Sequence, residues 1–96
     1  MTVVELLKEK REEILQIAQK HGARNVRVFG SATRGDATPE SDLDLLVEAG
    51  EQTSPWFPAG LVEELEDILG RPVDIVTEDS LYWLLKRRIL REARPL

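Results

Sequence analysis

Residues 28–47 have the sequence VFGSATRGDATPESDLDLLV, and this stretch decides the fold. An apolar segment ends at Gly30, a small hydroxyl residue follows, and a second, almost uniformly apolar segment begins after Asp42. β-Branched and aromatic residues favour strands, and glycine commonly ends them. The stretch therefore predicts strands over residues 25–29 and 43–47 joined by a short helix. The second strand is expected inside a sheet, because its residues are apolar on both faces.

Helical periodicity surrounds these two strands. Thr2 and Glu5 match a capping box, and the helix that follows is predicted over residues 3–21, before Gly22. The later elements are a long loop, a helix, a strand and a last helix, predicted at residues 48–60, 61–69, 73–76 and from the cap Ser80 onward. This order indicates one α/β domain over residues 1–96, with a small mixed β-sheet flanked by helices.

Composition narrows the class of protein. The 96 residues include 13 Lys and Arg, 18 Asp and Glu and no Cys, which gives a net charge of −5. This balance argues against broad nucleic-acid binding through phosphate neutralisation. Without Cys, thiolate zinc sites and cysteine nucleophiles are excluded, and a reducing compartment is favoured. No apolar run approaches the roughly 20 residues of a membrane helix, so we expect a cytoplasmic protein that does not contact the membrane.

Charge is distributed unevenly along the chain. Residues 1–34 carry seven basic and four acidic side chains, residues 35–79 carry one and thirteen, and residues 80–96 carry five and one. An acidic segment between basic ones suits a cation site beside a phosphate site. The acidic residues of the helix predicted at 61–69 have a simpler interpretation as a solvated face; they are Glu63, Glu64, Glu66 and Asp67.

Three aspartates are candidates for one site. Residues two apart on a strand share a face, with about 7 Å between their Cα atoms, so Asp42 and Asp44 project together while Leu43 enters the core. Asp74 joins them if its strand, residues 73–76, pairs with the strand that carries Asp44. Crowded carboxylates repel unless a cation lies between them, and oxygen ligands without His or Cys suit Mg²⁺ or Mn²⁺. Three such carboxylates could hold two divalent ions about 4 Å apart, an arrangement that supports nucleotidyl transfer.

The turn at Gly30 and Ser31 is a candidate phosphate site. Glycine allows an anion to approach the backbone, the following helix start presents N–H groups, and Ser31 adds a hydroxyl donor. Arg34 lies one turn later and could either reach a triphosphate or pair with Asp36 or Glu40.

Together these residues resemble the signature of the minimal nucleotidyltransferases in the DNA polymerase beta-like superfamily. That signature is Gly-Ser, ten residues, Asp-x-Asp and a later Asp on a strand. It is matched without a gap by Gly30-Ser31, residues 32–41, Asp42-Leu43-Asp44 and Asp74. The similarity extends over nearly the whole chain and implies the nucleotidyltransferase fold, which is like the palm of polymerase beta.

The resemblance also implies roles for the residues and a partner. Asp42 and Asp44 would bind the metals, Asp74 would complete the site next to the attacking hydroxyl, and Gly30 and Ser31 would hold the β- and γ-phosphates of ATP. Short members of the family are often encoded with a helical HEPN ribonuclease toxin and act as its antitoxin by transferring AMP to a toxin tyrosine. Composition and spacing do not show this partner.

Each candidate also has a purely structural interpretation. Asp42 and Asp44 could cap a turn or helix, Asp74 could form a buried salt bridge with Arg34, and Gly30-Ser31 could be an ordinary strand-to-helix turn. Loop capping is the simpler role for three neighbouring polar residues, Asp36, Glu40 and Ser41.

Further residues outside this stretch also invite two interpretations. His21 suits a helix carboxyl end. Trp56 and Phe57 could anchor their loop on the core, stack on a base or grip a partner. The cations of the last helix suit its carboxyl end or form a basic interaction face; they are Lys86, Arg87, Arg88, Arg91 and Arg94.

The sequence therefore predicts a magnesium-dependent nucleotidyltransferase that modifies a HEPN toxin. One alternative is a subunit that modifies a small molecule, in the manner of the antibiotic nucleotidyltransferases. The other is a non-catalytic module that sequesters its partner through the basic helix. The sequence leaves the nucleotide, the acceptor and any homo-oligomer open.

Overall fold

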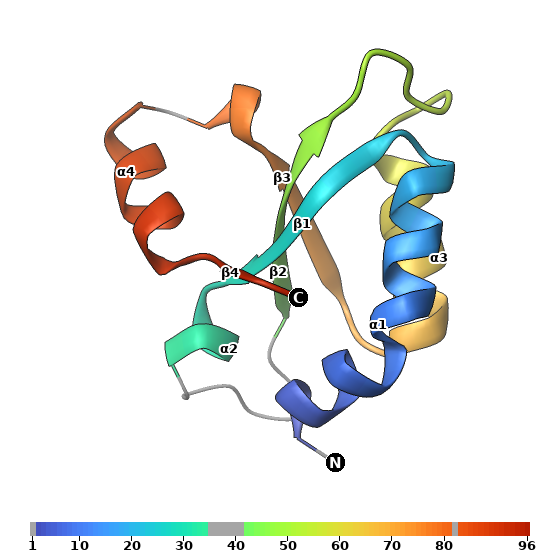
Figure 1. The fold of residues 1–96 in the computed structure, drawn as a ribbon, viewed down its shortest axis with the longest axis horizontal. Helices are drawn as coiled ribbons and strands as arrows, with labels where there is room; N and C mark the ends of the chain where they lie inside the picture. The colour runs from blue at the N-terminus through green and yellow to red at the C-terminus, as the bar shows by residue number, and fades with distance from the viewer. Residues whose placement is uncertain (1, 35–41, 82) are drawn as a thin grey trace.

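The helices and strands of the described residues are arranged around one four-stranded sheet (Figure 1). The computed structural model describes residues 2–34, 42–81 and 83–96. The elements in chain order are α1 (Val3–Lys20), β1 (Ala23–Phe29), α2 (Ser31–Arg34), β2 (Leu43–Ala49), α3 (Ala59–Leu69), β3 (Val73–Thr77), the 3₁₀ turn η1 (Glu78–Ser80), α4 (Trp83–Glu92) and β4 (Arg94–Pro95). The predicted order of elements is confirmed, with β4 added at the end.

The sheet is mixed, with the strand order β3-β2-β1-β4. β1 pairs antiparallel with both β2 and β4, whereas β2 and β3 run parallel. The prediction that residues 43–47 form an interior strand is confirmed, since β2 has a neighbour on each side. The sequence missed β4, because a two-residue strand containing Pro95 has no pattern of its own.

Helices α1 and α3 cover one face of the sheet, while α2 and α4 lie on the other side of the strands in Figure 1. The core forms where alternate residues of β2 meet these two helices. Ile14 of α1, Leu43 and Leu45 of β2 and Leu61 of α3 are each at most 1% exposed. Alternation along β2 therefore turns Asp44 toward the opposite side. We call this second side, which carries Asp44 and Asp74, the carboxylate face.

Local signals explain how α1 begins and ends. The Thr2 hydroxyl accepts a hydrogen bond from the Glu5 backbone N–H at 3.1 Å, which confirms the predicted cap. Gly22 follows the helix with φ +87°, and a Cβ there would overlap the Gln52 carbonyl of the neighbouring loop. A glycine is thus required where the chain turns from α1 into β1.

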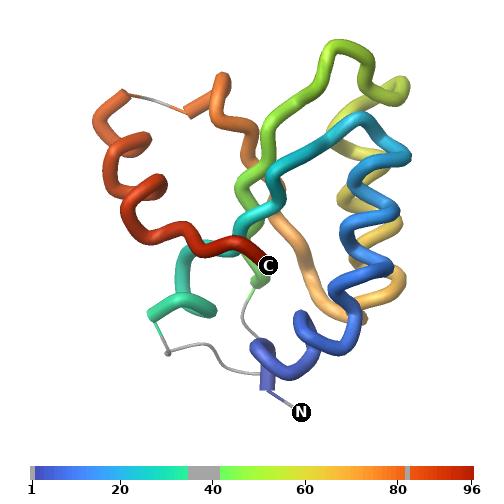
Figure 2. The backbone as a smooth tube through the Cα atoms, viewed as in Figure 1, coloured from blue at the N-terminus to red at the C-terminus, as the bar shows by residue number. Residues whose placement is uncertain are grey.

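The start of α4 differs from the prediction. Ser80 was expected to cap the last helix, but its hydroxyl donates to the Thr77 carbonyl at 2.9 Å inside η1. The helix itself begins at Trp83, so Leu81 precedes it. From α4 the chain returns across the strands toward α1 (Figure 2), where Arg11 Nε donates to the Leu96 carbonyl at 2.9 Å. In the part of the chain that the structure describes, no helix is both long and apolar enough to cross a membrane.

Candidate active site

The parallel pairing of β2 and β3 places two carboxylates side by side. Asp44 and Asp74 are register partners, and neighbouring strands lie about 4.8 Å apart. Their side chains share the carboxylate face, because Leu43 and Val73, one residue earlier on each strand, are both buried in the core. The prediction that Asp74 lies near Asp44 depended on this pairing of the two strands, and the pairing is confirmed.

Asp42 lies just before β2 and is exposed, two residues from Asp44. Its negative charge acts on the Asp44 carboxyl, so the two side chains are electrostatic neighbours. Nevertheless, no three His, Cys, Asp or Glu side chains among residues 2–34, 42–81 and 83–96 are grouped closely enough to hold a metal ion together. The described side chains thus form an Asp44–Asp74 pair with Asp42 at its edge, rather than a closed three-carboxylate cage.

The ionisation of Asp44 reflects this crowding. Burial raises the pKa of the Asp44 carboxyl above its ordinary value of 3.8, and the charges of Asp74 and Asp42 raise it further. The guanidinium of Arg34 acts in the opposite direction, while Glu92 adds to the increase. Asp44 is therefore a half-buried carboxylate in an excess of negative charge, a setting that a bound cation would relieve.

Gly30 lies against this carboxylate. Its φ is +79°, a backbone conformation that side chains disfavour, and a Cβ at this position would overlap Asp44 Oδ2. The Gly30 carbonyl accepts hydrogen bonds from the Thr33 and Arg34 backbone N–H groups, which starts the single turn of α2 at Ser31. The predicted phosphate turn and the predicted metal ligand are thus in direct contact.

Arg34 pairs with a residue that sequence reasoning missed. Its Nη1 lies 2.7 Å from Glu92 Oε1 at the end of α4, and the Thr33 hydroxyl lies 3.3 Å from the same oxygen. Asp36, the partner considered for Arg34 in the sequence, lies outside the described residues, as do Glu40 and Ser41. One sequence signal could have indicated Glu92, since it is the sole acidic residue among residues 80–96.

The salt-bridge interpretation of Asp74 is wrong. The Asp74 side chain is exposed, and no ion pair links it to another described residue. The expectation of burial came from its apolar neighbours in sequence, Val73 and Ile75, whose side chains point to the opposite face of the edge strand β3. Asp74 therefore faces solvent beside Asp44, where a substrate could reach it.

The donor set at this site fits Mg²⁺. This ion is usually held by one or two carboxylates together with substrate phosphates and water, and it does not need a cage built by protein alone. Asp44 and Asp74 supply two carboxylates on one face, and burial together with the charges of Asp74 and Asp42 raises the pKa of Asp44. His and Cys, which would favour other metals, are absent from the pair.

His21 has a larger structural role than the sequence predicted. It is buried where α1 ends, with Nδ1 2.6 Å from the Ser54 hydroxyl and Nε2 3.0 Å from Glu64 Oε1. Lys20 also contacts Glu64, at 2.9 Å, and the hydrogen bonds from Lys20 and His21 lower the pKa of the Glu64 carboxyl. His21 thus connects α1 to α3 and to the loop between β2 and α3.

The two aromatic residues of that loop, Trp56 and Phe57, lie in different environments. Phe57 packs partly against the core, which confirms an anchoring role for this residue. Trp56 is 88% exposed and anchors nothing, so that interpretation is wrong for Trp56.

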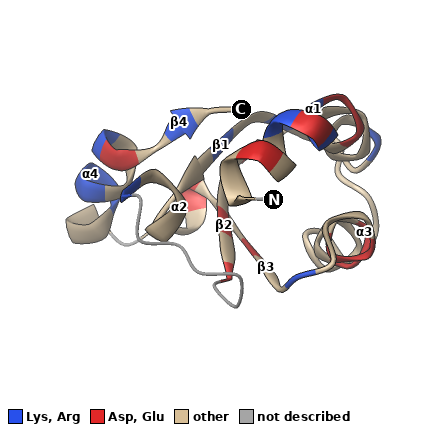
Figure 3. Cartoon of the chain, turned by 90° about the horizontal axis from the view of Figure 1, so that it is seen from below, with Lys and Arg blue, Asp and Glu red and all other residues tan. Residues whose placement is uncertain are grey.

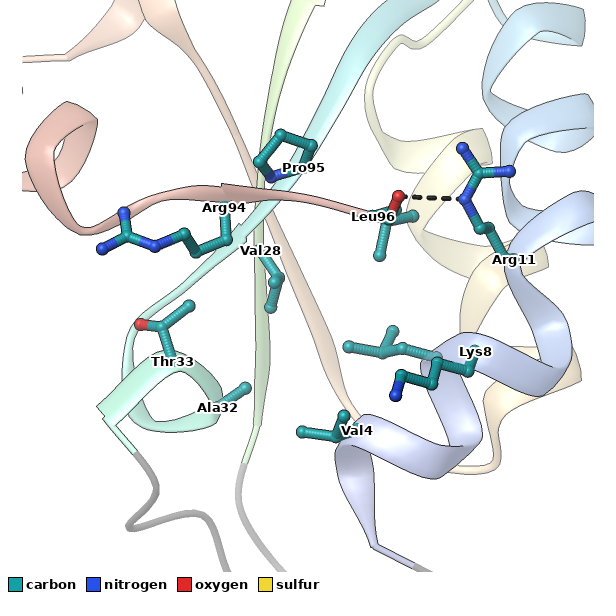
Figure 4. A pocket seen from close by; sticks show the side chains of 10 residues that line it. Val4, Lys8, Arg11, Val28, Ala32, Thr33, Arg94, Pro95 and Leu96 are labelled. Atoms are coloured by element: carbon teal, nitrogen blue, oxygen red, sulfur yellow. Dashed lines mark hydrogen bonds between the residues drawn. The ribbon is translucent and has the colours of Figure 1, made fainter.

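An apolar cavity of about 260 Å³ lies between α1, α2 and β4 (Figure 4). Its wall includes Val4, Val28 and Ala32, with the basic side chains of Lys8 and Arg94 near it. Neither Asp44 nor Asp74 lines the cavity, although Ala32 and Thr33 of α2 do. The cavity and the carboxylate pair are separate features of the molecule.

The chain matches the model of the nucleotidyltransferase domain family over residues 7–96. A protein of Methanocaldococcus jannaschii that carries the name protein adenylyltransferase is 42% identical over 91% of this chain and 94% of its own length. The protein adenylyltransferase MntA of Thermococcus cleftensis is 39% identical over 80% of this chain and 78% of its own length.

Solved structures share the fold. One, described as a minimal nucleotidyltransferase, is 46% identical with a TM-score of 0.87 and covers 99% of this chain and 97% of its own. A toxin–antitoxin structure with AMP-PNP has a TM-score of 0.74 at 21% identity, over 88% of this chain and 69% of that one. The second likeness shows the fold alone.

Proposed function

Because the chain belongs to the nucleotidyltransferase domain family, as a minimal nucleotidyltransferase, we propose that it transfers AMP from ATP to a hydroxyl of a partner protein. The observation that carries this proposal is the contact of the Gly30 turn with Asp44, which in turn lies beside Asp74. This arrangement joins a backbone turn suited to phosphates to a pair of carboxylates suited to Mg²⁺.

Each residue has a distinct role in the proposal. Gly30 and Ser31 hold the β- and γ-phosphates through backbone N–H groups and the serine hydroxyl, and Arg34 lies close enough to share their charge. Asp42 and Asp44 hold the metal ion that accompanies the nucleotide. Asp74 is exposed on the edge strand, so it completes the site for a second ion on the side from which the acceptor arrives.

The reaction is a substitution at the α-phosphorus of ATP. The acceptor hydroxyl loses its proton, its oxygen forms a bond to the α-phosphorus, and the bond to the β-phosphate oxygen breaks so that pyrophosphate leaves. When bound, Mg²⁺ or Mn²⁺ supplies positive charge that neutralises the phosphates and favours deprotonation of the hydroxyl. The chain itself positions the substrates, because the β2–β3 strand pair and the turn at Gly30 would hold the nucleotide and the acceptor hydroxyl in line.

We further propose that the acceptor is a tyrosine of a HEPN-type toxin and that the chain acts as its antitoxin. Relatives carry the name protein adenylyltransferase, and structures of the same fold are toxin–antitoxin complexes. Separately, Asp74 is exposed on the edge strand, which leaves the carboxylate face open to an acceptor carried by another protein.

Calorimetry with AMP-PNP tests the nucleotide site. We expect binding to the wild type with Mg²⁺ and none with EDTA, and we expect the double variant Asp42→Ala with Asp44→Ala to lose it. The matched control is Asp67→Ala on α3, which is exposed and should bind normally. Unchanged binding by the double variant would contradict the assignment of the two aspartates. Binding without any transfer to a HEPN partner would instead favour sequestration over catalysis.

A further inference from the structure

Helix α4 is unusually exposed for an element at an active site. None of its described side chains is buried, and three large apolar ones protrude: Trp83 at 66%, Leu84 at 56% and Leu85 at 51% exposure. A ten-residue helix gains little stability by itself in water and normally depends on packing. At its carboxyl end, Arg94 Nη1 donates to the carbonyls of residues 91–93.

The exposed side of α4 combines apolar and cationic residues. Trp83, Arg87 and Leu90 recur at i, i+4 and i+7 and form one row along the helix. Leu84, Arg88 and Arg91, each one residue later in the sequence, form a second row beside the first, so the two rows share one side of the helix. We call this side the outer face of α4; it consists of Trp83, Leu84, Arg87, Arg88, Leu90 and Arg91, all exposed. Tryptophan and arginine are the residues that contribute most often to binding energy in protein interfaces.

The same helix touches the candidate active site. Glu92, at its last turn, contacts Arg34 at 2.7 Å and the Thr33 hydroxyl at 3.3 Å, and its charge acts on Asp44. A protein bound along α4 would therefore lie next to the carboxylate face. An acceptor hydroxyl on such a protein could reach the exposed Asp74 from there.

We propose that the outer face of α4 docks the acceptor protein, through a partner surface that is apolar at its centre and acidic around it. This inference rests on the proposed function and specifies the surface that recognises the partner. Leucine and tryptophan side chains require apolar contacts, and the three arginines require carboxylates, which they bind in a bidentate manner. The partner is thus identified by chemistry complementary to this face.

A second copy of the chain fits less well. Its acidic helix is α3, which lies at the opposite end of the molecule from α4, as the charges in Figure 3 show. Contact between α4 of one copy and α3 of the next would therefore join opposite ends of the two molecules. RNA also fits less well, because Leu84 and Leu90 offer nothing to a phosphate backbone, and the chain carries a net charge of −5.

A pair of matched double variants tests the docking surface. The test variant is Trp83→Ala with Arg87→Glu, and the control is Trp56→Ala with Arg24→Glu, which removes the same groups from exposed positions on other elements. Arg87→Glu places a carboxylate four residues before Arg91, and alanine favours helix, so α4 should remain folded. Circular dichroism and the melting temperature check this for both proteins.

The assay is AMP transfer to a HEPN-type partner protein, at several concentrations of that protein. We expect the test variant to raise the KM for the partner at least 30-fold, roughly the effect of losing one strong interface residue, with kcat little changed. AMP-PNP affinity should stay at the wild-type value, and the control variant should behave like the wild type.

The outcomes separate the two proposals. If the wild type transfers no AMP to this partner, the proposed function fails. If the wild type is active and the test variant has a normal KM, or the control loses as much, the docking surface is refuted. A wild-type dimer that the test variant dissociates would assign the face to a second copy, and tRNA binding lost without change in partner KM would assign it to RNA.

Discussion

Replacement of Asp44 by asparagine should stabilise the metal-free protein and abolish its stabilisation by the nucleotide. Like charges side by side on neighbouring strands cost about 0.2–1 kcal/mol, and Asp44 faces Asp74 in register. Asparagine keeps the shape and removes the charge, so we expect the free energy of unfolding to rise by about 0.5–1 kcal/mol. For a chain of 96 residues this corresponds to a melting temperature about 2–8 °C higher.

The same substitution should have the opposite effect once ligands are present. Mg²⁺ and AMP-PNP at about 100 times the dissociation constant stabilise a protein by about 2.7 kcal/mol, and the variant should gain almost none of this. The order of the two melting temperatures should therefore invert on addition of the ligands. Asp67→Asn, the same change at an exposed position of α3, should shift neither melting temperature by more than a degree or two.

The pH dependence of stability independently checks whether Asp44→Asn stabilises the metal-free protein. The pKa of Asp44 is raised in the folded chain, so its ionised form destabilises the fold above that pKa, and the penalty disappears as the pH falls toward 3.8. The advantage of Asp44→Asn in metal-free buffer should shrink over the same range. A variant that melts several degrees lower without metal, or that keeps the ligand-induced increase, would refute this electrostatic reasoning.

Three further substitutions probe the site and its support. Asp74→Asn should leave the melting temperature within a few degrees of the wild type, because the side chain is exposed, while single-turnover transfer falls by orders of magnitude; a fully active variant would remove Asp74 from the reaction. Gly30→Ala should lower nucleotide affinity, because the added Cβ displaces the Asp44 carboxylate. Gly70→Ala is the control: Gly70 is also at positive φ, but a Cβ there has nothing within 4 Å, so this variant should lose only about 1 kcal/mol of stability and no affinity. Equal nucleotide affinities of the two variants would contradict the contact between Gly30 and Asp44. His21→Ala should lower the free energy of unfolding by about 1–3 kcal/mol at unchanged kcat, and a loss of kcat instead would give the histidine a role that its position does not suggest.

The sequence predicted the elements well where a local physical signal marked them. The cap at Thr2, the left-handed residues Gly22 and Gly70 and the apolar run of β2 all correspond to the structure within a few residues. β1 begins at Ala23, two residues before the predicted start at Asn25, because the polar Arg24 lies beside an irregularity in the strand pairing. The polar residues at a strand irregularity carry no alternation from which a strand could be predicted.

The candidate site was predictable in its residues but not in its contacts. The spacing of Gly30, Asp42, Asp44 and Asp74 is visible in the amino-acid sequence. The strand periodicity also predicts that Asp42 and Asp44 share a face. The exposure of Asp74 depends on β3 being an edge strand, which is a property of the sheet order.

Glu92 and the outer face of α4 show the same limit. Glu92 reaches Arg34 only because α4 and α2 meet on one side of the strands, far apart in sequence. The leucines of α4 have a helical spacing that is also typical of a helix packed on a core. Only the structure shows that this helix exposes them, and the proposed docking surface is for this reason apolar as well as cationic.

The most direct test of the central claim follows the label of ATP into the HEPN partner. ATP labelled at the α-phosphate and ATP labelled at the γ-phosphate are each incubated with the wild-type chain, Mg²⁺ and the partner, beside the double variant Asp42→Ala with Asp44→Ala. The account predicts that the α-label alone becomes attached to the partner, that pyrophosphate is released in equal amount, and that the double variant transfers neither label. Transfer of the γ-label, or α-label transfer that survives the loss of both aspartates, would contradict it.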